Sequence, residues 1–195
     1  MKMNICVFGA SSTILDNHFI EAVEKLGEEM GKRGHSLVFG AGANGLMGAA
    51  ARGVHKTGGN IYGVVPSFFK EESISQLFDK CTELIYTETM AQRKSKMEDM
   101  ADAFIIVPGG MGTFEELFEV LTLKQLGRHT KPIVIYNIDN YYNGLEAFIG
   151  EAMEKNFIMK ECKTLYGCFD SAEEVLSYIE NDKQIKRDVH DLKLG

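Results

Sequence analysis

The sequence lacks the features of a membrane-bound, secreted or multidomain protein. No apolar run approaches the roughly 20 residues that a membrane span needs, and residues 1–8 lead directly into Gly9 without a signal-peptide core. No Pro/Ser-rich stretch, low-complexity segment or internal repeat divides the chain. We therefore expect one domain at residues 1–180, a loosely packed polar tail at 181–195, no membrane association and a cytoplasmic location.

A basic block and a metal-binding pattern are also missing. The formal net charge is −7, and the 21 Lys and Arg residues are scattered along the chain, which disfavours nucleic-acid binding. The four cysteines, Cys6, Cys81, Cys162 and Cys168, form no C-x-x-C pair and have no histidine at ligand spacing. We expect buried, reduced thiols and no metal.

What is present is an alternation of short apolar runs and amphipathic stretches. Most runs are continuously apolar, which is typical of parallel strands covered by helices on both faces. The stretches between them follow helical spacing, as Phe19, Val23, Leu26 and Met30 do. The pattern predicts an α/β fold with a doubly wound parallel sheet, whose ligand site lies where strands lead through loops into helices. The predicted strands are residues 4–8, 36–39, 60–65, 84–86, 103–107, 133–136 and 165–169.

Two loops that follow predicted strands consist of small residues. The first, Gly9-Ala10-Ser11-Ser12, lets a ligand approach the backbone and offers hydroxyl groups, although any α/β protein needs a tight turn there. The second, residues 40–45, fits G-x-G-x-x-G, but it follows the second strand and no acid appears before Glu71 to bind a ribose. We therefore do not expect NAD. These glycines instead let a helix at 45–57 begin close under a ligand.

A third loop, residues 108–113, contains three glycines between a buried run and an amphipathic helix. Successive backbone N–H groups and the positive end of the helix suit a phosphate. No lysine follows the glycines, so this is not a Walker A loop. Thr113 and Glu116 also fit T-x-x-E, so Glu116 either caps the helix or faces another part of the ligand.

Arg93 falls in an apolar helical stripe with Met90, Met97 and Met100. An unpaired charge in such a stripe is costly. Arg93 therefore either snorkels at the helix start or binds an anion, such as a phosphate or a carboxylate of the same crevice.

Arg93-Lys94 followed by P-G-G-M-G-T-F-E-E at residues 108–116 resembles the hallmark of the LOG ("Lonely Guy") family of cytokinin riboside 5'-monophosphate phosphoribohydrolases, R-K then P-G-G-x-G-T-x-x-E. The resemblance extends from the first strand to about Pro132. It implies a Rossmann-like homodimer that releases a free base and ribose 5-phosphate without a metal or redox cofactor. The adjacent Phe68 and Phe69 would suit the dimer interface if they are not in the core.

The resemblance also implies roles for individual residues. Arg93 and Glu116 match the family's catalytic pair. Positions that match its nucleotide-binding residues are Lys94, Gly110, Met111, Gly112, Thr113, Glu115 and Thr122. Further candidate substrate-binding residues are Gly9, Ser11, Ser12, Gly45 and Gly109, together with Met47, which lies in the stretch that the resemblance covers.

Three departures from the family pattern are Ala10 and Ala41, where many relatives carry glycine, and Met111, where Tyr, Ile or Leu is commoner. They remove no charged catalytic group but leave the base preference open. Many relatives carry a lysine decarboxylase label, which would require a pyridoxal phosphate site that the sequence does not show.

The chain is therefore interpreted as a hydrolase that cleaves the N-glycosidic bond of a purine nucleoside 5'-monophosphate, with N6-prenylated adenine among the candidate bases. Glu116 would stabilise the positive charge that develops on the ribose and orient water, while Arg93 stays ionised and fixes the nucleotide. The alternative is a non-catalytic carrier of a nucleotide or of the molybdenum cofactor, which would not need both residues. An NAD-dependent oxidoreductase is a third class and lacks the ribose acid.

Overall fold

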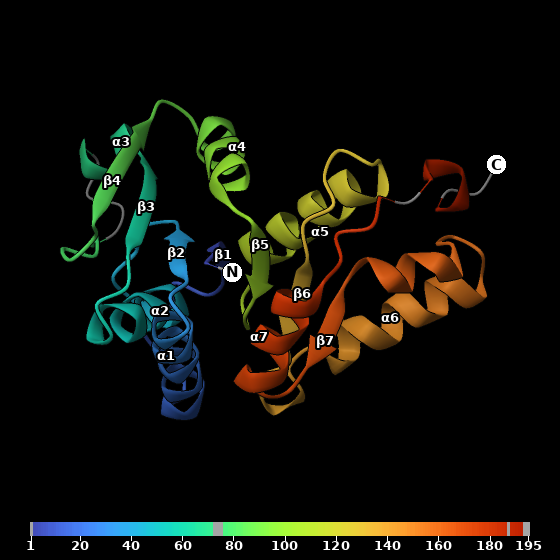
Figure 1. Cartoon of the computed structure of the whole chain (residues 1–195), viewed down its shortest axis with the longest axis horizontal. Helices are drawn as coiled ribbons and strands as arrows, with labels where there is room; N and C mark the ends of the chain where they lie inside the picture. Colours follow the sequence, from blue (N-terminus) through green and yellow to red (C-terminus); the bar gives the residue numbers. More distant parts are fainter. Residues whose placement is uncertain (1, 72–75, 187, 193–195) are drawn as a thin grey trace.

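The computed structural model describes residues 2–71, 76–186 and 188–192 and contains a seven-stranded parallel sheet covered by helices on both faces (Figure 1). The strand order is β4-β3-β2-β1-β5-β6-β7. The strands are β1 (Asn4–Phe8), β2 (Ser36–Phe39), β3 (Ile61–Pro66), β4 (Glu83–Thr87), β5 (Ala103–Ile106), β6 (Ile133–Tyr136) and β7 (Gly167–Phe169). All seven predicted strands are confirmed, with shifts only at their ends.

Two apolar cores lie on opposite faces of the sheet, because successive side chains of each strand point to opposite sides. Ile5 and Val7 of β1 pack with one helix layer, and Cys6 and Phe8 pack with the other. The first layer contains α1 (Asn17–Lys32), α2 (Gly45–Lys56) and α7 (Ala172–Asn181). The second contains α4 (Met90–Met100), α5 (Met111–Gln125) and α6 (Asn143–Glu154). The remaining helices are α3 (Ser67–Glu71), η1 (Ile138–Asn140), η2 (Lys160–Leu165) and η3 (Val189–Asp191).

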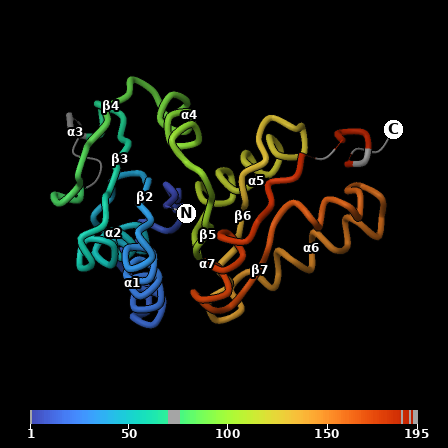
Figure 2. The backbone as a smooth tube through the Cα atoms, viewed as in Figure 1, coloured from blue at the N-terminus to red at the C-terminus, as the bar shows by residue number. Residues whose placement is uncertain are grey.

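The strand order reverses at the centre of the sheet, which is where open α/β folds bind ligands. From β1 the chain adds β2, β3 and β4 on one side, and β5, β6 and β7 on the other (Figure 2). Backbone hydrogen bonds join the three glycine loops at this point. Ala10 N donates to Pro108 O at 3.0 Å, and Leu46 N donates to Ala10 O at 2.8 Å.

Leu192, within the tail predicted at 181–195, is buried, which the sequence did not indicate. After α7 ends at Asn181, the chain returns to α5, where Leu192 is 1 % exposed. Gln125 Nε2 donates to Leu192 O at 2.6 Å, and the Cys162 thiol contacts the same oxygen at 3.3 Å. Residues 187 and 193–195 of the predicted tail lie outside the described residues.

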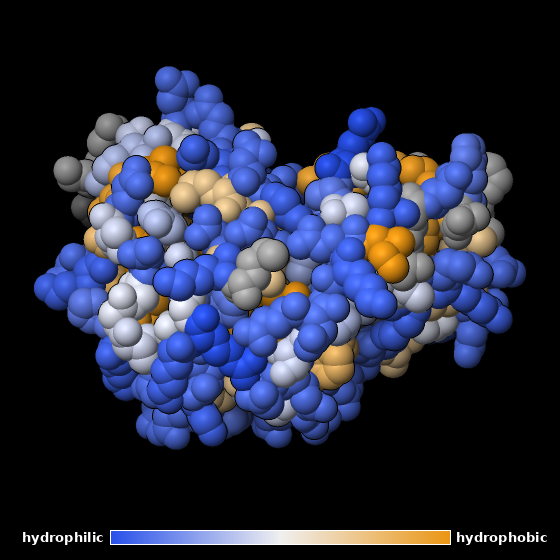
Figure 3. All heavy atoms as spheres, viewed as in Figure 1, coloured by the Kyte–Doolittle hydropathy of each residue, from blue (hydrophilic) through white to orange (hydrophobic). Residues whose placement is uncertain are grey.

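The surface shown in Figure 3 is mainly hydrophilic, with apolar side chains in separate patches. Over the described ranges, none of the helices is both long and apolar enough to cross a membrane. The four cysteines are unpaired, as predicted. Cys6 and Cys162 are buried, whereas Cys81 and Cys168 are half-buried.

Candidate active site

The loops at the carboxyl ends of the central strands enclose a cavity of about 620 Å³. This volume lies in the range of small-molecule sites, roughly 300 to 1,000 Å³. One wall comes from Gly9, Ala10 and Ser11 after β1 and from Gly110, Gly112, Thr113 and Glu116 after β5. The other wall comes from Gly40, Gly42, Asn44, Met47, Phe69 and Gln76, with Arg93 from α4.

Arg93 is held in this cavity by the backbone of the sheet. Thr89 and Gln92 form a capping box that starts α4 one turn before it. The Arg93 side chain is 8 % exposed, and its Nε donates to Val64 O at 3.1 Å. Its guanidinium also fills the space above Gly40, where an added Cβ would overlap it. Arg93 is therefore buried, and the snorkelling alternative is wrong.

Glu116 supplies the negative partner of Arg93. Its Oε1 lies 4.0 Å from Arg93 Nη1, and its side chain is 13 % exposed. The capping-box interpretation of Thr113 and Glu116 is wrong, because α5 begins at Met111 with Gly110 as its N-cap and no side-chain cap. Thr113 is instead buried in the first turn, so Glu116 is free to face the cavity.

Burial raises the pKa of Glu116 to about 7. The nearby Arg93 guanidinium opposes this shift and Glu115 reinforces it, but desolvation of the carboxylate is the largest cause. An acid that titrates near neutrality beside a fixed cation, in a cavity, is typical of groups that take part in proton transfer or stabilise developing charge.

The glycine loop after β5 presents its backbone to the cavity. A Cβ added at Gly110 or Gly112 would meet nothing within 4 Å, so both sites leave open space beside the first turn of α5. Gly109 does not line the cavity but lies against Thr113, where an added Cβ would overlap the threonine side chain. The first turn of α5 therefore offers backbone N–H donors to an anion without side chains in the way.

Two tyrosines that the sequence did not indicate bind backbone carbonyls of this loop and of the residue just before it. Tyr141 OH donates to Gly109 O at 2.6 Å, and Tyr142 OH donates to Val107 O at 2.9 Å. Both follow β6, more than 30 residues along the chain from the carbonyls they bind. No local sequence spacing signals such a contact.

The predicted residues of the first two loops separate into those that line the cavity and those that support it. Gly9, Ser11 and Met47 line it. Ser12 does not, since its hydroxyl accepts from Ile14 N at 3.4 Å. Gly45 also lies outside it, with a φ of 61° and no room for a Cβ against the backbone of residues 10 and 11. Gly45 thus allows α2 to begin close to the first loop.

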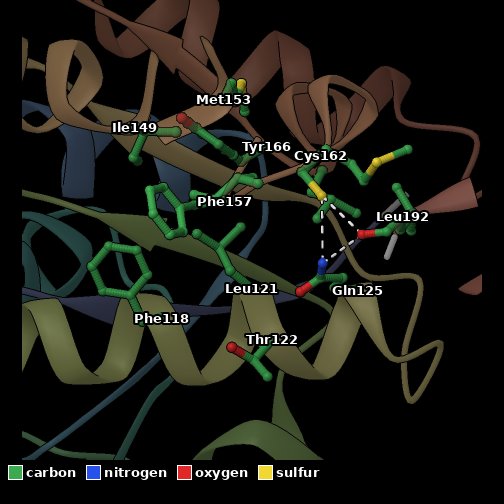
Figure 4. A pocket seen from close by; sticks show the side chains of 13 residues that line it. Phe118, Leu121, Thr122, Gln125, Ile149, Met153, Phe157, Cys162, Tyr166 and Leu192 are labelled. Carbon is green, nitrogen blue, oxygen red and sulfur yellow. Dashed lines mark hydrogen bonds between the residues drawn. The ribbon is translucent and has the colours of Figure 1, made fainter. Parts of the chain in front are cut away.

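Four other predicted residues, Lys94, Met111, Glu115 and Thr122, lie outside the cavity of their own chain. Lys94 pairs with Glu115 and, at 2.8 Å, with Glu119, and these contacts raise the pKa of Lys94. Met111 is 85 % exposed. Thr122 is among the lining residues of a different, apolar pocket of about 490 Å³ between α5 and α6, and Phe118 and Leu121 point into that pocket (Figure 4).

Several lining residues were not predicted. Asn44 is the N-cap of α2, yet its side chain makes no capping hydrogen bond. Phe69 and Gln76 come from the segment after β3, and Phe68 packs on Phe69 with ring centroids 5.1 Å apart. Ala41, which departs from the family pattern, has a φ of 63°, in the region that favours glycine.

Comparison with known proteins identifies the family. Residues 47–179 match the family model described as "possible lysine decarboxylase". The protein named cytokinin riboside 5'-monophosphate phosphoribohydrolase LOG2 of Arabidopsis thaliana is 38 % identical over 90 % of this chain and 82 % of its own length. A probable enzyme of the same name, LOGL5 of Oryza sativa subsp. japonica, is 38 % identical over 97 % of this chain and 76 % of its own length. The chain belongs to this LOG family.

Solved structures with the same fold include the molybdenum cofactor carrier protein MCP of Chlamydomonas reinhardtii, with a TM-score of 0.69, 19 % identity and coverage of 92 % of this chain and 97 % of that protein. The molybdenum cofactor binding protein of Rippkaea orientalis gives a TM-score of 0.66 at 19 % identity, covering 92 % and 94 %. At this identity the likeness shows the Rossmann-like fold alone.

The decarboxylase description of the family model does not fit the cavity. Pyridoxal phosphate chemistry uses a lysine that forms a Schiff base in the site. Among the side chains that the structure describes, none of the lining residues is a lysine, and Lys94 is engaged by carboxylates. No group of three or more His, Cys, Asp or Glu that would hold a metal ion occurs within the described ranges.

Proposed function

We propose that this protein hydrolyses the N-glycosidic bond of a purine nucleoside 5'-monophosphate to the free base and ribose 5-phosphate. The observation that carries the proposal is the pair of buried Arg93 and largely enclosed Glu116, set 4.0 Å apart in the same cavity as an open glycine loop at a helix N-terminus. The names of relatives at 38 % identity support the same activity.

Each part of the cavity suits one part of this reaction. The backbone N–H groups of the first turn of α5 bind the 5'-phosphate. As the bond from the sugar to the base breaks, positive charge grows on the ribose, and the Glu116 carboxylate stabilises it and orients a water molecule. The water oxygen bonds to the sugar carbon, and its proton goes to the departing base. Arg93 stays ionised and fixes the nucleotide electrostatically.

We also propose that the protein acts as a homodimer through α5. Met111, Glu115, Phe118 and Thr122 are exposed at spacings of four, three and four, so they form one stripe along this helix, here called the α5 stripe. Three of these residues match nucleotide-binding positions of the family, yet none lines the cavity of its own chain. If a second copy covered the α5 stripe, the stripe residues of the first copy would lie near the cavity of the second. The second copy would also cover the apolar pocket of Figure 4.

A non-catalytic carrier is the second candidate, because the molybdenum-cofactor carriers share the fold. A carrier needs an anion site but has no use for a buried acid that titrates near neutrality beside a buried arginine. The Arg93–Glu116 pair therefore favours hydrolysis.

The test is to incubate the purified protein with AMP, its N6-prenylated counterpart and the two matching nucleosides, and to follow the free base. We expect base release from the monophosphates. Charge-assisted hydrogen bonds contribute roughly 1.5 to 3 kcal/mol each, so a nucleoside that lacks the phosphate should lose several orders of magnitude in kcat/KM.

Glu116→Gln keeps the size of the side chain but removes its charge, so this variant should bind AMP and release no base. Similar kcat/KM for adenosine and AMP would contradict the phosphate site. Binding of AMP without base release by the unmodified protein would favour the carrier.

A further inference from the structure

The cavity has two chemically different ends. At one end, Gly110 and Gly112 leave backbone donors open to an anion. At the other end, Met47 and Phe69 are the large apolar side chains that line it in the described part of the chain. Met47 reaches over Gly42, where an added Cβ would lie 3.5 Å from Met47 Cε. This end therefore suits a flat apolar group.

The two groups of lining residues follow different strands of the sheet. The glycine loop follows β5, whereas Phe69 follows β3, and β1 and β2 lie between these strands. Three strand spacings amount to about 14 Å. Arg93 contacts Val64 of β3 and Glu116 is on α5, so this pair joins the two sides of the cavity. If the nucleotide phosphate binds at the loop and the sugar binds at this pair, the base extends toward Phe69.

We propose that Phe69, with Met47, forms the base subsite of the proposed reaction, and that the Phe69 ring packs on the face of the base and favours purines over pyrimidines. This inference rests on the proposed function for its substrate class. An aromatic ring and a thioether in one cavity give apolar contact area that increases with the size of the base. Two ring systems fill this subsite better than one.

Carboxamides at the edge of the subsite complete it. The Asn44 side chain is not used as a helix cap, and Gln76 lines the same wall. A carboxamide can donate and accept together, which matches the edge of adenine. The segment that carries Gln76 is joined to the loop after β2, where Ala43 N donates to Gln76 O at 2.8 Å and Phe78 N donates to Ala41 O at 2.9 Å.

The experiment measures binding, so that it does not depend on turnover. Dissociation constants for AMP, CMP and ribose 5-phosphate are determined by calorimetry with Glu116→Gln and with Glu116→Gln carrying Phe69→Ala. Removing an aromatic ring that stacks on a base weakens binding by about 10- to 100-fold. We expect that loss for AMP, a smaller loss for CMP, and no change for ribose 5-phosphate, which has the phosphate and sugar but no base.

Two further variants serve as controls. Phe69→Tyr keeps the ring and should retain the affinity for AMP, whereas Phe148→Ala removes an exposed ring of α6 and should change nothing. Equal weakening of AMP and ribose 5-phosphate by Phe69→Ala, or none for either, would overturn the base subsite. If Phe69→Ala weakens AMP binding as expected but the unmodified protein releases no base from AMP, the hydrolase is disproved and the subsite stands.

Discussion

At the scale of single residues, Gly40 and Arg93 depend on each other. The Arg93 guanidinium lies in the space that a Cβ at position 40 would occupy. Gly40→Ala should therefore displace the guanidinium while the strand remains, and a displacement of about 1 Å costs on the order of 100-fold in rate. We expect kcat for AMP hydrolysis to fall by that amount with an unchanged circular dichroism spectrum. Gly144→Ala, where the added Cβ would meet nothing within 4 Å, is the control and should keep full activity.

Glu116 predicts a pH dependence of activity. The mechanism needs its carboxylate, and burial holds the pKa of Glu116 at about 7. Arg93 and Lys94 act to lower this pKa, and Glu115 and Glu119 act to raise it. The value of kcat/KM for AMP should therefore rise as the pH increases through about 7 and level off above it. A profile that is flat between pH 5.5 and 8.5, or that falls through this range, would rule out an ionised Glu116 as the active form.

The same group predicts a change of stability in the opposite direction. The folded protein keeps the Glu116 proton up to about pH 7, whereas the unfolded chain releases it near 4.5. The free energy of unfolding should therefore fall as the pH rises between these values, by on the order of 3 kcal/mol. Burial and the nearby Glu119 also raise the pKa of Glu98 to about 7, so Glu98 adds to this slope. Denaturant titrations at a series of pH values give the free energy of unfolding at each pH. This free energy should change less with pH for Glu116→Gln than for the unmodified protein.

The sequence indicated which residues are candidates for the site better than it indicated what each of them does. Spacing alone could not decide whether Glu116 caps a helix or faces a ligand, because both roles place an acid in the first turns. The structure decides it through the start of α5 at Met111, two residues before the threonine of the expected cap. Phe69 carries no motif, and only the fold of the segment after β3 brings it to the cavity.

At the scale of elements, replacing a helical glycine with alanine should change stability in opposite directions in α6 and α2. Gly150 lies inside α6, and a Cβ there would meet nothing within 4 Å. Gly53 lies inside α2, where a Cβ would overlap the Glu24 carbonyl and lie 2.8 Å from Glu28 N of α1. Gly150→Ala should raise the free energy of unfolding by about 0.5 to 1 kcal/mol, and Gly53→Ala should lower it. Thermal unfolding of the two variants checks both signs, and a loss of stability in Gly150→Ala would contradict the open environment of α6.

The elements themselves could largely be predicted. Continuous apolar runs identify buried parallel strands, and β1, β2 and β6 begin and end at the predicted residues. The return of the tail could not be predicted, because Leu192 reaches α5 by one apolar side chain and a carbonyl that accepts from Gln125. A polar stretch with a single buried residue gives no periodic signal.

At the scale of the whole molecule, the position of the site follows from the topology. The reversal of strand order beside β1 gathers loops that are about 100 residues apart, and the hydrogen bond from Ala10 N to Pro108 O joins two of them. Alternation of strands and helices in the sequence predicts this arrangement in general. Met111 and Thr122, which match nucleotide-binding positions of the family, are exposed and lie outside the cavity, and the alternation of strands and helices does not predict this.

The proposed dimer predicts the effect of a charge on the α5 stripe. Phe118 is 41 % exposed in the single chain, and an interface there would bury it, so an unpaired carboxylate at this position would be costly only in the dimer. Light scattering should give about twice 21.7 kDa for the unmodified protein and the mass of one chain, 21.7 kDa, for Phe118→Asp. Phe148→Asp places the same charge on an exposed ring of α6, 65 % exposed, and should stay dimeric.

The activity of Phe118→Asp then tests whether the two copies only contact each other or also share residues of the active site. If Glu115 and Thr122 of one copy serve the cavity of the other, the monomeric Phe118→Asp protein should lose most base release although its Arg93 and Glu116 are intact. Raising its concentration until the dimer forms again should restore activity in step with the mass. A monomer that is as active as the dimer would show that each cavity is complete in its own chain. A mass of 21.7 kDa for the unmodified protein at micromolar concentration would refute the dimer itself.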